Sequence, residues 1–340
     1  MKPPASPPTG RALRAFVLGA PTPLAAGLTY EWLRAGNRIA CIYCAQRGSS
    51  PGRLRHDARL GRYSPQLSLS AIASHCGIEL NFISTSQSWD RLQLEIERQD
   101  PDIILSLMFL ARIPARIIAV ARGRLLNIHP ALLPAYRGLS SLSSMQYDGT
   151  AAEYAGLTLH VVTEEFDAGP IVSQIAVPPP ETGNFADHLH GLISAGEVLV
   201  RALPAYLAGE IKPVPQDCEA PQRRSHALSE IVIRPLHSAV EIIRIFRTGG
   251  PLHKLAVEGL SPSLKVDGFL CRLGPAQLQP PQVGWRGIEL DLADCRVRLR
   301  RASRFRDKIR KMMMIRKLVR LSDRRQQSLK DNAKSLHGTE

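Results

Sequence analysis

Short apolar runs alternate with helical patterns over the first two-thirds of the chain. Residues 24–36 have helical spacing and end at a glycine, as helices often do. Runs with the length of buried strands lie at 13–19, 38–44, 79–84, 102–109 and 125–130. This alternation predicts an α/β fold with a Rossmann-like, mostly parallel sheet and helices on both of its faces. Ligands bind such sheets beyond the carboxyl ends of the strands, and Asn127 and His129 lie at the end of the fifth run.

The pattern changes further along the chain. Strand-like runs at 158–162 and 169–177 and a helical stretch at about 184–208 precede a segment rich in proline and charge, which predicts a domain boundary. Beyond it, one helical pattern at 237–249 precedes several short strand-like runs, which are typical of a small β-rich domain. We therefore expect a disordered lead, an α/β domain, a linker, a small β-rich domain and a basic tail, at 1–12, 13–208, 209–225, 226–303 and 304–340.

Positive charge is concentrated near the C-terminus. The net charge is +14, and residues 296–330 hold 15 Lys and Arg against two acids, whereas residues 1–295 hold 28 basic and 26 acidic residues. Apolar residues recur every three or four positions along the tail, at Phe305, Ile309, Met312, Ile315 and Val319. This spacing among arginines and lysines predicts a basic amphipathic helix. Such a helix suits a nucleic acid, an anionic membrane surface, or packing of its apolar face on the body of the protein.

Two further segments limit the classes of protein to be considered. Residues 45–65 are polar, contain several arginines and three glycines, and predict a long exposed loop, a kind of loop that is often functional. Cys41 and Cys44 form a CxxC within an apolar strand pattern, and no second pair follows at zinc spacing, so we expect no metal site. Six cysteines in 340 residues do not make a disulfide scaffold, and no apolar run is long enough to span a membrane, so we expect a cytoplasmic protein.

The most informative segment lies between residues 102 and 174. Asn127 and His129 are separated by one residue, and Leu132-Leu133-Pro134, Arg137-Gly138 and Asp167-Ala168-Gly169 follow them. This combination resembles the 10-formyltetrahydrofolate-dependent formyltransferases, which include methionyl-tRNA, glycinamide-ribonucleotide and amino-sugar formyltransferases. The resemblance covers about 13–212 and implies that 13–208 is a catalytic domain with the formyltransferase fold.

The three polar residues of this pattern are of the types that formyl transfer requires. When an amine attacks the formyl carbon, an oxyanion develops, and a preorganised donor aimed at it stabilises the transition state. We expect Asn127 to donate through its amide and His129 to donate when protonated. A carboxylate close to His129 favours the imidazolium, and Asp167 is the candidate; Asp167 is also a candidate base for the proton of the amine. Residues 127 and 129 of a strand project to the same side, so both groups face one site.

Binding of 10-formyltetrahydrofolate is implied by the resemblance rather than by composition. In the family, the pterin ring lies against backbone groups of two loops, which match 107–113 and 162–167 here. The resemblance therefore implies donor-site residues at Leu107, Phe109, Arg112, Ile113, Val162, Thr163 and Glu165. Arg112 faces either the ligand or the solvent. The glycine turn at Gly19 lacks a GxGxxG pattern, which argues against a dinucleotide site.

The sequence leaves the acceptor amine open. Methionyl-tRNA is our first candidate, because formyltransferases of that class have an extra basic loop and a small β-barrel domain, to which 45–65 and 226–303 correspond. A small amine, such as an amino sugar nucleotide or a hydroxylated amino acid, is the alternative, and a non-catalytic formyltransferase-like binding module is a third reading. The chain departs from the family pattern at Ala131 and at 139–142, and the second departure lies where acceptors are gripped.

Overall fold

The structure is a computed structural model that describes residues 11–46, 51–181, 184–217, 223–227, 229–248 and 254–337. The predicted lead at 1–12 therefore lies outside the described residues, except for its last two. Among the helices in these ranges, none is both long enough and apolar enough to cross a membrane.

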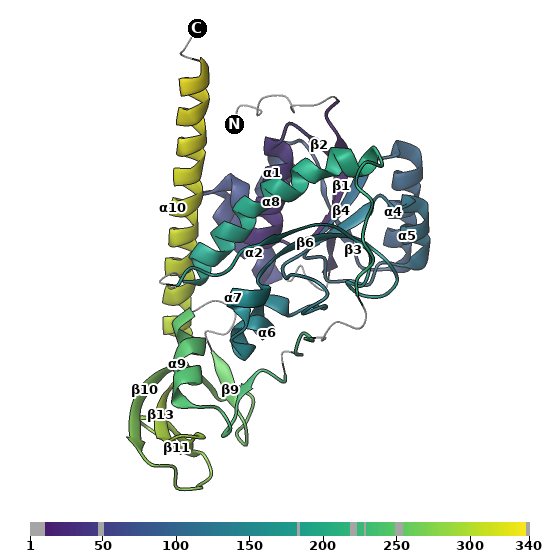
Figure 1. Ribbon diagram of the computed structural model, residues 1–340. Helices are drawn as coiled ribbons and strands as arrows, with labels where there is room; N and C mark the ends of the chain where they lie inside the picture. The colour runs from purple at the N-terminus through teal and green to yellow at the C-terminus, as the bar shows by residue number, and fades with distance from the viewer. Residues whose placement is uncertain are drawn as a thin grey trace.

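A seven-stranded sheet forms the centre of the larger domain (Figure 1). Its strand order is β3-β2-β1-β4-β5-β6-β7, the first five strands are parallel, and β6 and β7 run antiparallel to their neighbours. The strands are β1 Arg14–Gly19, β2 Arg38–Ala45, β3 Leu80–Ile83, β4 Ile103–Leu107, β5 Leu125–His129, β6 Gly156–Val161 and β7 Ile171–Ala176. The predicted mostly parallel, Rossmann-like sheet is confirmed.

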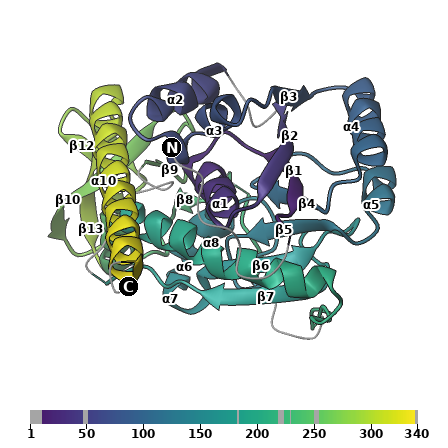
Figure 2. The same ribbon diagram turned by 90° about the horizontal axis from the view of Figure 1, so that it is seen from above.

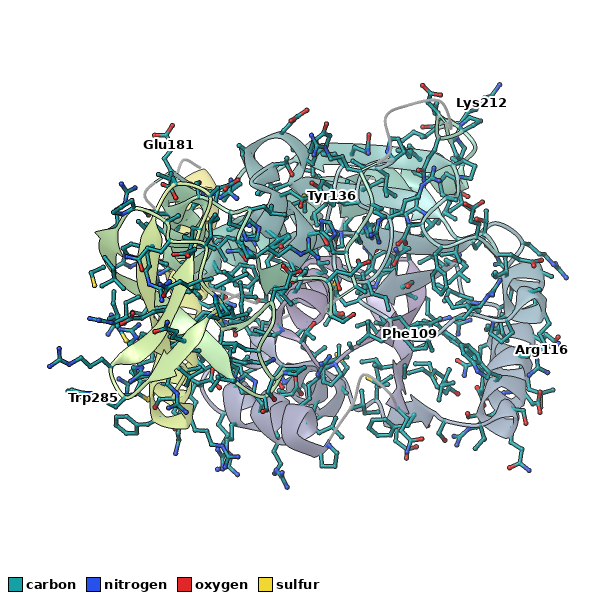
Figure 3. All side chains as sticks on the ribbon, turned by 90° about the horizontal axis from the view of Figure 1, so that it is seen from below. Phe109, Arg116, Tyr136, Glu181, Lys212 and Trp285 are labelled. Atoms are coloured by element: carbon teal, nitrogen blue, oxygen red, sulfur yellow. The ribbon has the colours of Figure 1, made fainter. Side chains whose placement is uncertain are left out.

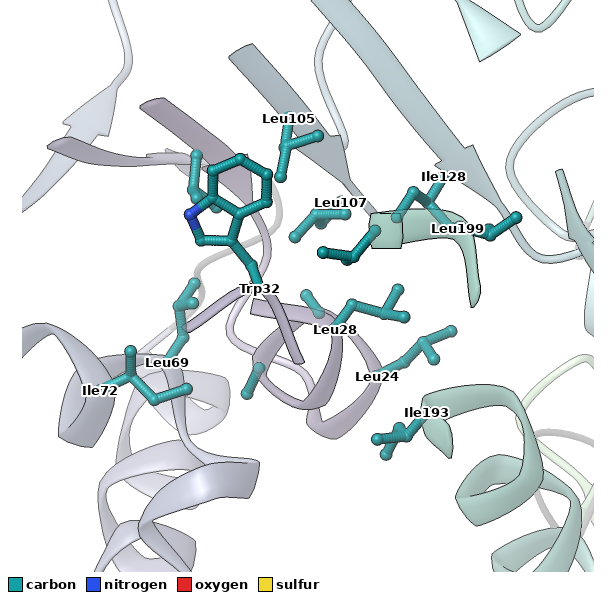
Figure 4. Packing of buried hydrophobic residues seen from close by; sticks show 14 of the residues in the cluster. Leu24, Leu28, Trp32, Leu69, Ile72, Leu105, Leu107, Ile128, Ile193 and Leu199 are labelled. Carbon is teal, nitrogen blue, oxygen red and sulfur yellow. The ribbon is translucent and has the colours of Figure 1, made fainter. Parts of the chain in front are cut away.

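Helices cover both faces of this sheet, because its strands are apolar on both sides. The helices are α1 Pro23–Arg34, α2 Pro51–Gly61, the 3-10 helix η2 Pro65–Leu67, α3 Leu69–His75, α4 Ser86–Gln99, α5 Ala115–Ala121, α6 Ser141–Asp148, α7 Ala151–Tyr154 and α8 Phe185–Leu207. On one face, α1, α3 and α8 pack on the strands around the fully buried Trp32 (Figure 4). On the other face, α4 and α5 bury Leu92, Ile96 and Ile117.

A second, smaller sheet with its own apolar core follows. Its order is β11-β12-β13-β10-β9-β8, and α9, which comprises Ala239–Thr248, buries Ile242 and Ile245 against it. The strands are β8 Val232–Ile233, β9 Leu255–Val257, β10 Lys265–Gly274, β11 Gln282–Gly284, β12 Gly287–Asp291 and β13 Arg296–Arg301. The expected β-rich second domain is therefore confirmed. The domain boundaries at 208, 225 and 303 stay predictions, although separate cores lie on the two sides of the linker.

The C-terminal segment is a long helix, α10, which comprises Arg304–His337 (Figures 1 and 2). Leu318 of α10 is fully buried in the core of the larger domain, and Met314 and Ile315 pack beside it. The helix was predicted, but not the position of its apolar face: Phe305 is 72% exposed and Met312 is 43% exposed. The buried face begins only at Met314, because the first turns of α10 do not reach the core beneath α8.

The expectation of a long exposed loop at 45–65 is wrong. Residues 51–61 form α2 and residues 65–67 form η2, whereas 47–50 lie outside the described residues. A buried acidic residue, Asp57, which is 2% exposed, anchors this segment together with the buried Leu60. Its carboxylate accepts hydrogen bonds from the Leu69 amide and from the amide and hydroxyl of Ser70 at the start of α3. A buried carboxylate looks like a solvated residue in the sequence, which explains the wrong expectation.

Candidate active site

Strand β5 carries two of the three residues expected to act in the chemistry. Asn127 pairs with Ser106 of β4 and with His160 of β6, and His129 lies opposite Thr158. Because alternate residues of a strand face the same side, Asn127 and His129 both line one pocket at the carboxyl end of β5. The pocket thus lies where parallel sheets place their ligands.

Asp167 lies in the loop between β6 and β7 and meets both residues of β5. Its Oδ1 accepts a hydrogen bond from Asn127 Nδ2 at 3.1 Å, its Oδ2 lies 3.4 Å from His129 Nδ1, and the Gly138 amide donates to Oδ2 at 2.8 Å. Asp167 has a φ of 54°, a region that residues other than glycine rarely adopt. Gly169 leaves no room for a side chain, since a Cβ there would collide with the backbone of β6. The loop therefore adopts an unfavourable backbone conformation, in which the Asp167 carboxylate contacts the side chains of β5.

The ring of His129 is buried and held at both nitrogens. Nε2 lies 2.9 Å from the carbonyl oxygen of Tyr136, so the neutral ring carries its hydrogen on Nε2 and leaves Nδ1 towards Asp167. Burial lowers the pKa of His129 because a charged ring is poorly solvated there, and this outweighs the opposing effects of the Asp167 carboxylate and the Tyr136 carbonyl. We expected Asp167 to favour the imidazolium. It does act in that direction, but the burial of the ring has the larger effect and favours the neutral form.

The Asp167 carboxylate is ionised. Burial acts to raise its pKa, but the charge of His129, the hydrogen bond and charge of His160 and the Gly138 amide together lower the pKa to about 2. A carboxylate with so low a pKa is a poor proton acceptor at neutral pH. This finding weakens the expectation that Asp167 itself removes the proton of the amine.

His160 of β6 belongs to the same cluster, and the sequence did not single it out. Its Nδ1 lies 3.0 Å from the Val161 carbonyl oxygen, and its Nε2 lies 3.1 Å from Asn127 Nδ2 and 3.4 Å from Asp167 Oδ1. If Nδ1 carries the hydrogen, Nε2 accepts from Asn127, and both hydrogens of the Asn127 amide are engaged, by His160 and Asp167. The available signal was the cross-strand pair Asn127–His160, which cannot be read before the antiparallel pairing of β6 is known.

The pocket is an open cleft in front of this cluster. Two loops form its walls, 108–113 after β4 and 162–167 after β6. Among the expected donor-site residues, those that line it are Phe109, Arg112, Ile113, Val162, Thr163 and Glu165. Arg112 also bridges the two loops, because Nη2 donates to the Glu164 carbonyl oxygen at 3.4 Å. Leu107 is different: its side chain is fully buried in the core beneath α1 (Figure 4) and does not line the pocket.

The mouth of the pocket is formed partly by the segment that departs from the family pattern. Leu139 lines the pocket and is 67% exposed, and Ser141 begins α6 at its edge. Ala131 is fully buried behind the site and lines no part of it.

Figure 3 shows Phe109 and Tyr136 towards the middle of the molecule, with Arg116 and Trp285 near opposite margins. Among the described residues, no group of His, Cys, Asp and Glu side chains has the geometry to hold a metal ion.

Comparison with known proteins agrees with this geometry. A sequence model of the family described as formyl transferase matches residues 61–184. The methionyl-tRNA formyltransferase of Streptococcus thermophilus is 44% identical over 92 residues, which are 27% of this chain and 29% of that protein. The methionyl-tRNA formyltransferase of Limosilactobacillus fermentum is 34% identical over 120 residues, 34% of this chain and 37% of that protein. The chain thus spans about a third of the length of these relatives.

The fold agrees over a longer part of the chain. An N-formyltransferase from Helicobacter canadensis, solved in complex with folinic acid and dTDP-3-aminofucose, has a TM-score of 0.54. The superposition covers 85% of this chain and 99% of that chain at 15% sequence identity, so it shows a shared fold. The shared fold agrees with the match of residues 61–184 to the formyl transferase model, and Asn127, His129 and Asp167 of this matched segment lie around one pocket.

Proposed function

We propose that this chain transfers a formyl group from 10-formyltetrahydrofolate to an amine. The observation that carries the proposal is the cluster in which Asp167 joins Asn127 and His129 at one wall of an open pocket. The two loops expected to hold the pterin ring form the other walls. The folinic acid in the structurally similar Helicobacter canadensis enzyme supports a reduced folate as the donor.

The protonation states in the cluster support a role for His129 as the group that moves the proton. A neutral ring with its hydrogen on Nε2 has a lone pair on Nδ1, which accepts the proton of the attacking amine while the new C–N bond forms. The ionised Asp167 beside Nδ1 stabilises the imidazolium that results. The imidazolium then gives this proton to N10 of the folate as the bond between N10 and the formyl carbon breaks. The amine has gained a formyl group, the folate has gained a hydrogen, and His129 is neutral again.

Asn127 is the proposed donor to the oxyanion. Its amide hydrogens already face Asp167 and His160, so donation to the oxyanion requires exchange of one of these hydrogen bonds. Such an exchange is inexpensive when the new acceptor carries a developing charge, because hydrogen bonds to charged groups are the stronger ones. Each donor of this type typically contributes about 3 kcal/mol to transition-state stabilisation.

For the acceptor we propose methionyl-tRNA. The curated relatives named above support it, and so does a basic surface on the outside of the larger domain. This basic surface consists of exposed residues of two helices: Arg55, Arg59 and Arg62 of or next to α2, and Lys308, Arg316, Arg320 and Arg324 of α10. In the part of the chain that the structure describes, none of the seven lies within ion-pair distance of a carboxylate.

The two helices of the basic surface are neighbours. Gln66 of η2 donates to Ser322 of α10 at 3.0 Å. Burial, and to a smaller extent the charges of Lys311 and Arg59, lower the pKa of His56, which is a further sign that α2 lies near α10. Unpaired cations on neighbouring helices suit the phosphate backbone of a nucleic acid. An anionic membrane surface is the other candidate partner of the tail.

The test is a transfer assay with radiolabelled 10-formyltetrahydrofolate and a panel of acceptors: charged initiator tRNA, amino sugar nucleotides and small hydroxylated amines. Label on the tRNA supports the full proposal. Label on a small amine reassigns the acceptor and keeps the chemistry. Tight folate binding without transfer to any acceptor supports the reading of a non-catalytic binding module, and absence of folate binding contradicts the proposal as a whole.

A further inference from the structure

The linker between the two domains contacts the loops that carry the candidate active site. Its described parts, 209–217 and 223–225, form what we call the strap. Val214 exchanges two backbone hydrogen bonds with Ile171, at 2.7 and 2.8 Å, so the strap begins as a short antiparallel partner of β7. A covalent tether between domains does not require any such pairing with the larger domain.

Gln216 of the strap binds on both sides of Asp167. Its Nε2 donates to the carbonyl oxygens of Asp167 and Gly169, each at 2.8 Å. Its Oε1 accepts from Nε and Nη2 of Arg137, at 3.0 and 2.7 Å. An amide side chain has two hydrogens to donate and two acceptor positions, so these four bonds satisfy the whole hydrogen-bonding capacity of the Gln216 side chain. Arg137 in turn precedes Gly138, whose amide donates to the Asp167 carboxylate.

The other end of the strap reaches the partner of His129. The Tyr136 amide donates to the Arg223 carbonyl oxygen, and the Ser225 hydroxyl donates to the Tyr136 carbonyl oxygen at 2.9 Å. That same oxygen lies 2.9 Å from Nε2 of His129 and holds the ring in one tautomer. The strap therefore contacts the backbone that orients both the Asp167 carboxylate and the His129 ring.

The backbone at both contacts is in a strained conformation. Asp167 has a φ of 54° and Tyr136 a φ of 58°, and such conformations persist only where the surroundings hold them. Among the described residues, the group that donates a hydrogen bond to the backbone carbonyl oxygen of Asp167 is the Gln216 amide. Without this amide, the loop is expected to relax and to carry the carboxylate away from His129 Nδ1, which is already 3.4 Å distant.

We propose that Gln216 is a positioning residue that holds Asp167 against His129, so that the strap between the domains forms part of the catalytic machinery. The inference rests on the proposed formyl transfer. Gln216 touches neither the pocket nor a reacting atom; it acts through the backbone of the Asp167 loop. A displacement of about 1 Å in such a group costs on the order of 100-fold in rate.

Two substitutions of Gln216 separate its donor and acceptor functions. Gln216→Ala removes all four hydrogen bonds. Gln216→Glu removes the two donors to the carbonyl oxygens of Asp167 and Gly169 but keeps an acceptor for Arg137. We expect kcat to fall by about 100-fold in both, with the KM for the folate donor changed by less than about threefold. A Gln216→Glu variant with the kcat of the wild type would overturn the proposal, because the donors would then be dispensable.

Gln66→Ala is the matched control. Gln66 is also a mostly buried glutamine that joins distant segments, since it donates to Ser322 of α10, but it lies away from the pocket. We expect this variant to keep its kcat within about twofold. An equal loss of kcat in Gln66→Ala and Gln216→Ala would mean that general loosening, and not positioning, causes the effect, and would contradict the proposal.

A readout that does not need turnover keeps this test separate from the test of the function. The titration of His129 is followed by NMR in isotopically labelled wild type and Gln216→Ala, and its signal is assigned from the spectrum of His129→Gln. The ionisable groups that face Asp167 are His129 and His160, and the Asp167 charge acts to raise the pKa of His129. We therefore expect the pKa of His129 to fall in Gln216→Ala. An unchanged titration contradicts the positioning role, whereas a fall in a protein that transfers no formyl group upholds the positioning role and contradicts the function.

Discussion

The Asp167 cluster and the basic surface on α2 and α10 use charge in opposite ways. In the cluster, one partly buried carboxylate has four partners within 3.4 Å, from β5, β6 and the loop before α6. On the basic surface, seven exposed cations have no carboxylate partner among the described residues. The first arrangement depends on the position of each atom, and the second depends on the number of charges. Single substitutions should therefore have large effects in the cluster and small, graded effects on the surface.

The largest effect is expected for Asp167→Asn. This change removes the charge that stabilises the His129 imidazolium but keeps the size of the side chain, and we expect kcat to fall by about 1000-fold. Binding of the folate donor, measured by fluorescence titration, should stay within about threefold because the walls of the pocket are unchanged. Asp90→Asn, on the exposed side of α4, is the control. Full activity in Asp167→Asn would exclude a catalytic role for the cluster.

A smaller effect, on stability, is expected where α10 joins the body. Glu31 of α1 is 2% exposed and pairs with Arg34, at 2.8 Å, and with Arg325 of α10. Arg325→Met leaves a buried carboxylate with one of its two partners, and we expect a loss of about 3 kcal/mol in the free energy of unfolding, measured by urea denaturation.

Arg324→Met tests the same helix one residue earlier. Arg324 is exposed and belongs to the basic surface, so we expect a change of less than about 0.5 kcal/mol in the free energy of unfolding. If both variants lost the same stability, α10 would not be held by the ion pair, and its interpretation as a docked part of the larger domain would need revision.

The pH dependence of the reaction should follow His129. Burial lowers the pKa of this ring, and the proposed chemistry needs it neutral, so activity should be lost as the pH falls through a pKa below the ordinary 6.5. Below that pKa, kcat/KM should fall about tenfold per pH unit. Asp167 makes no contribution in this range because its pKa of about 2 keeps it ionised. Activity that instead falls as the pH rises through this range would argue that His129 acts in its charged form.

The smallest single effects are expected on the basic surface. Replacement of Arg316, Arg320 or Arg324 by serine should each weaken RNA binding a few fold and lower the slope of log affinity against log salt by about 1. Arg116→Ser, on α5 at the opposite margin of the molecule in Figure 1, is the matched control. An unchanged salt slope in the triple variant would exclude RNA as the partner of this surface. Binding of the wild type to anionic vesicles, but not to RNA, would favour a membrane surface instead.

The same comparison explains what could be predicted from the sequence. Strand β5, which carries the site, could be predicted because Asn127 and His129 interrupt an apolar run. Strands β1, β2 and β4 could be predicted because they are apolar runs of strand length. The amphipathic pattern of α10 was equally clear, although the burial of Leu318 and the exposure of Phe305 depend on where the helix crosses the body.

The residues that escaped prediction act through contacts that leave no local pattern. Gln216 is one glutamine in a proline-rich linker, and its partners are backbone carbonyl oxygens, which every residue has. His160 belongs to the site only through the antiparallel pairing of β6 with β5. Asp57 anchors α2 from within, where the sequence predicts a solvated loop. Each case depends on a tertiary contact rather than on spacing along the chain.

The most direct test of the central claim follows the formyl carbon itself. The wild type and Asp167→Asn are each mixed in excess with 10-formyltetrahydrofolate that carries 13C in the formyl group, together with the acceptor found in the panel assay. We predict that the 13C signal moves from N10 of the folate to the amine with the wild type. With Asp167→Asn, it should stay on the bound folate over the same time. Movement of the label at the same rate with both proteins, or with neither, would contradict the account of an Asp167-centred formyl transferase.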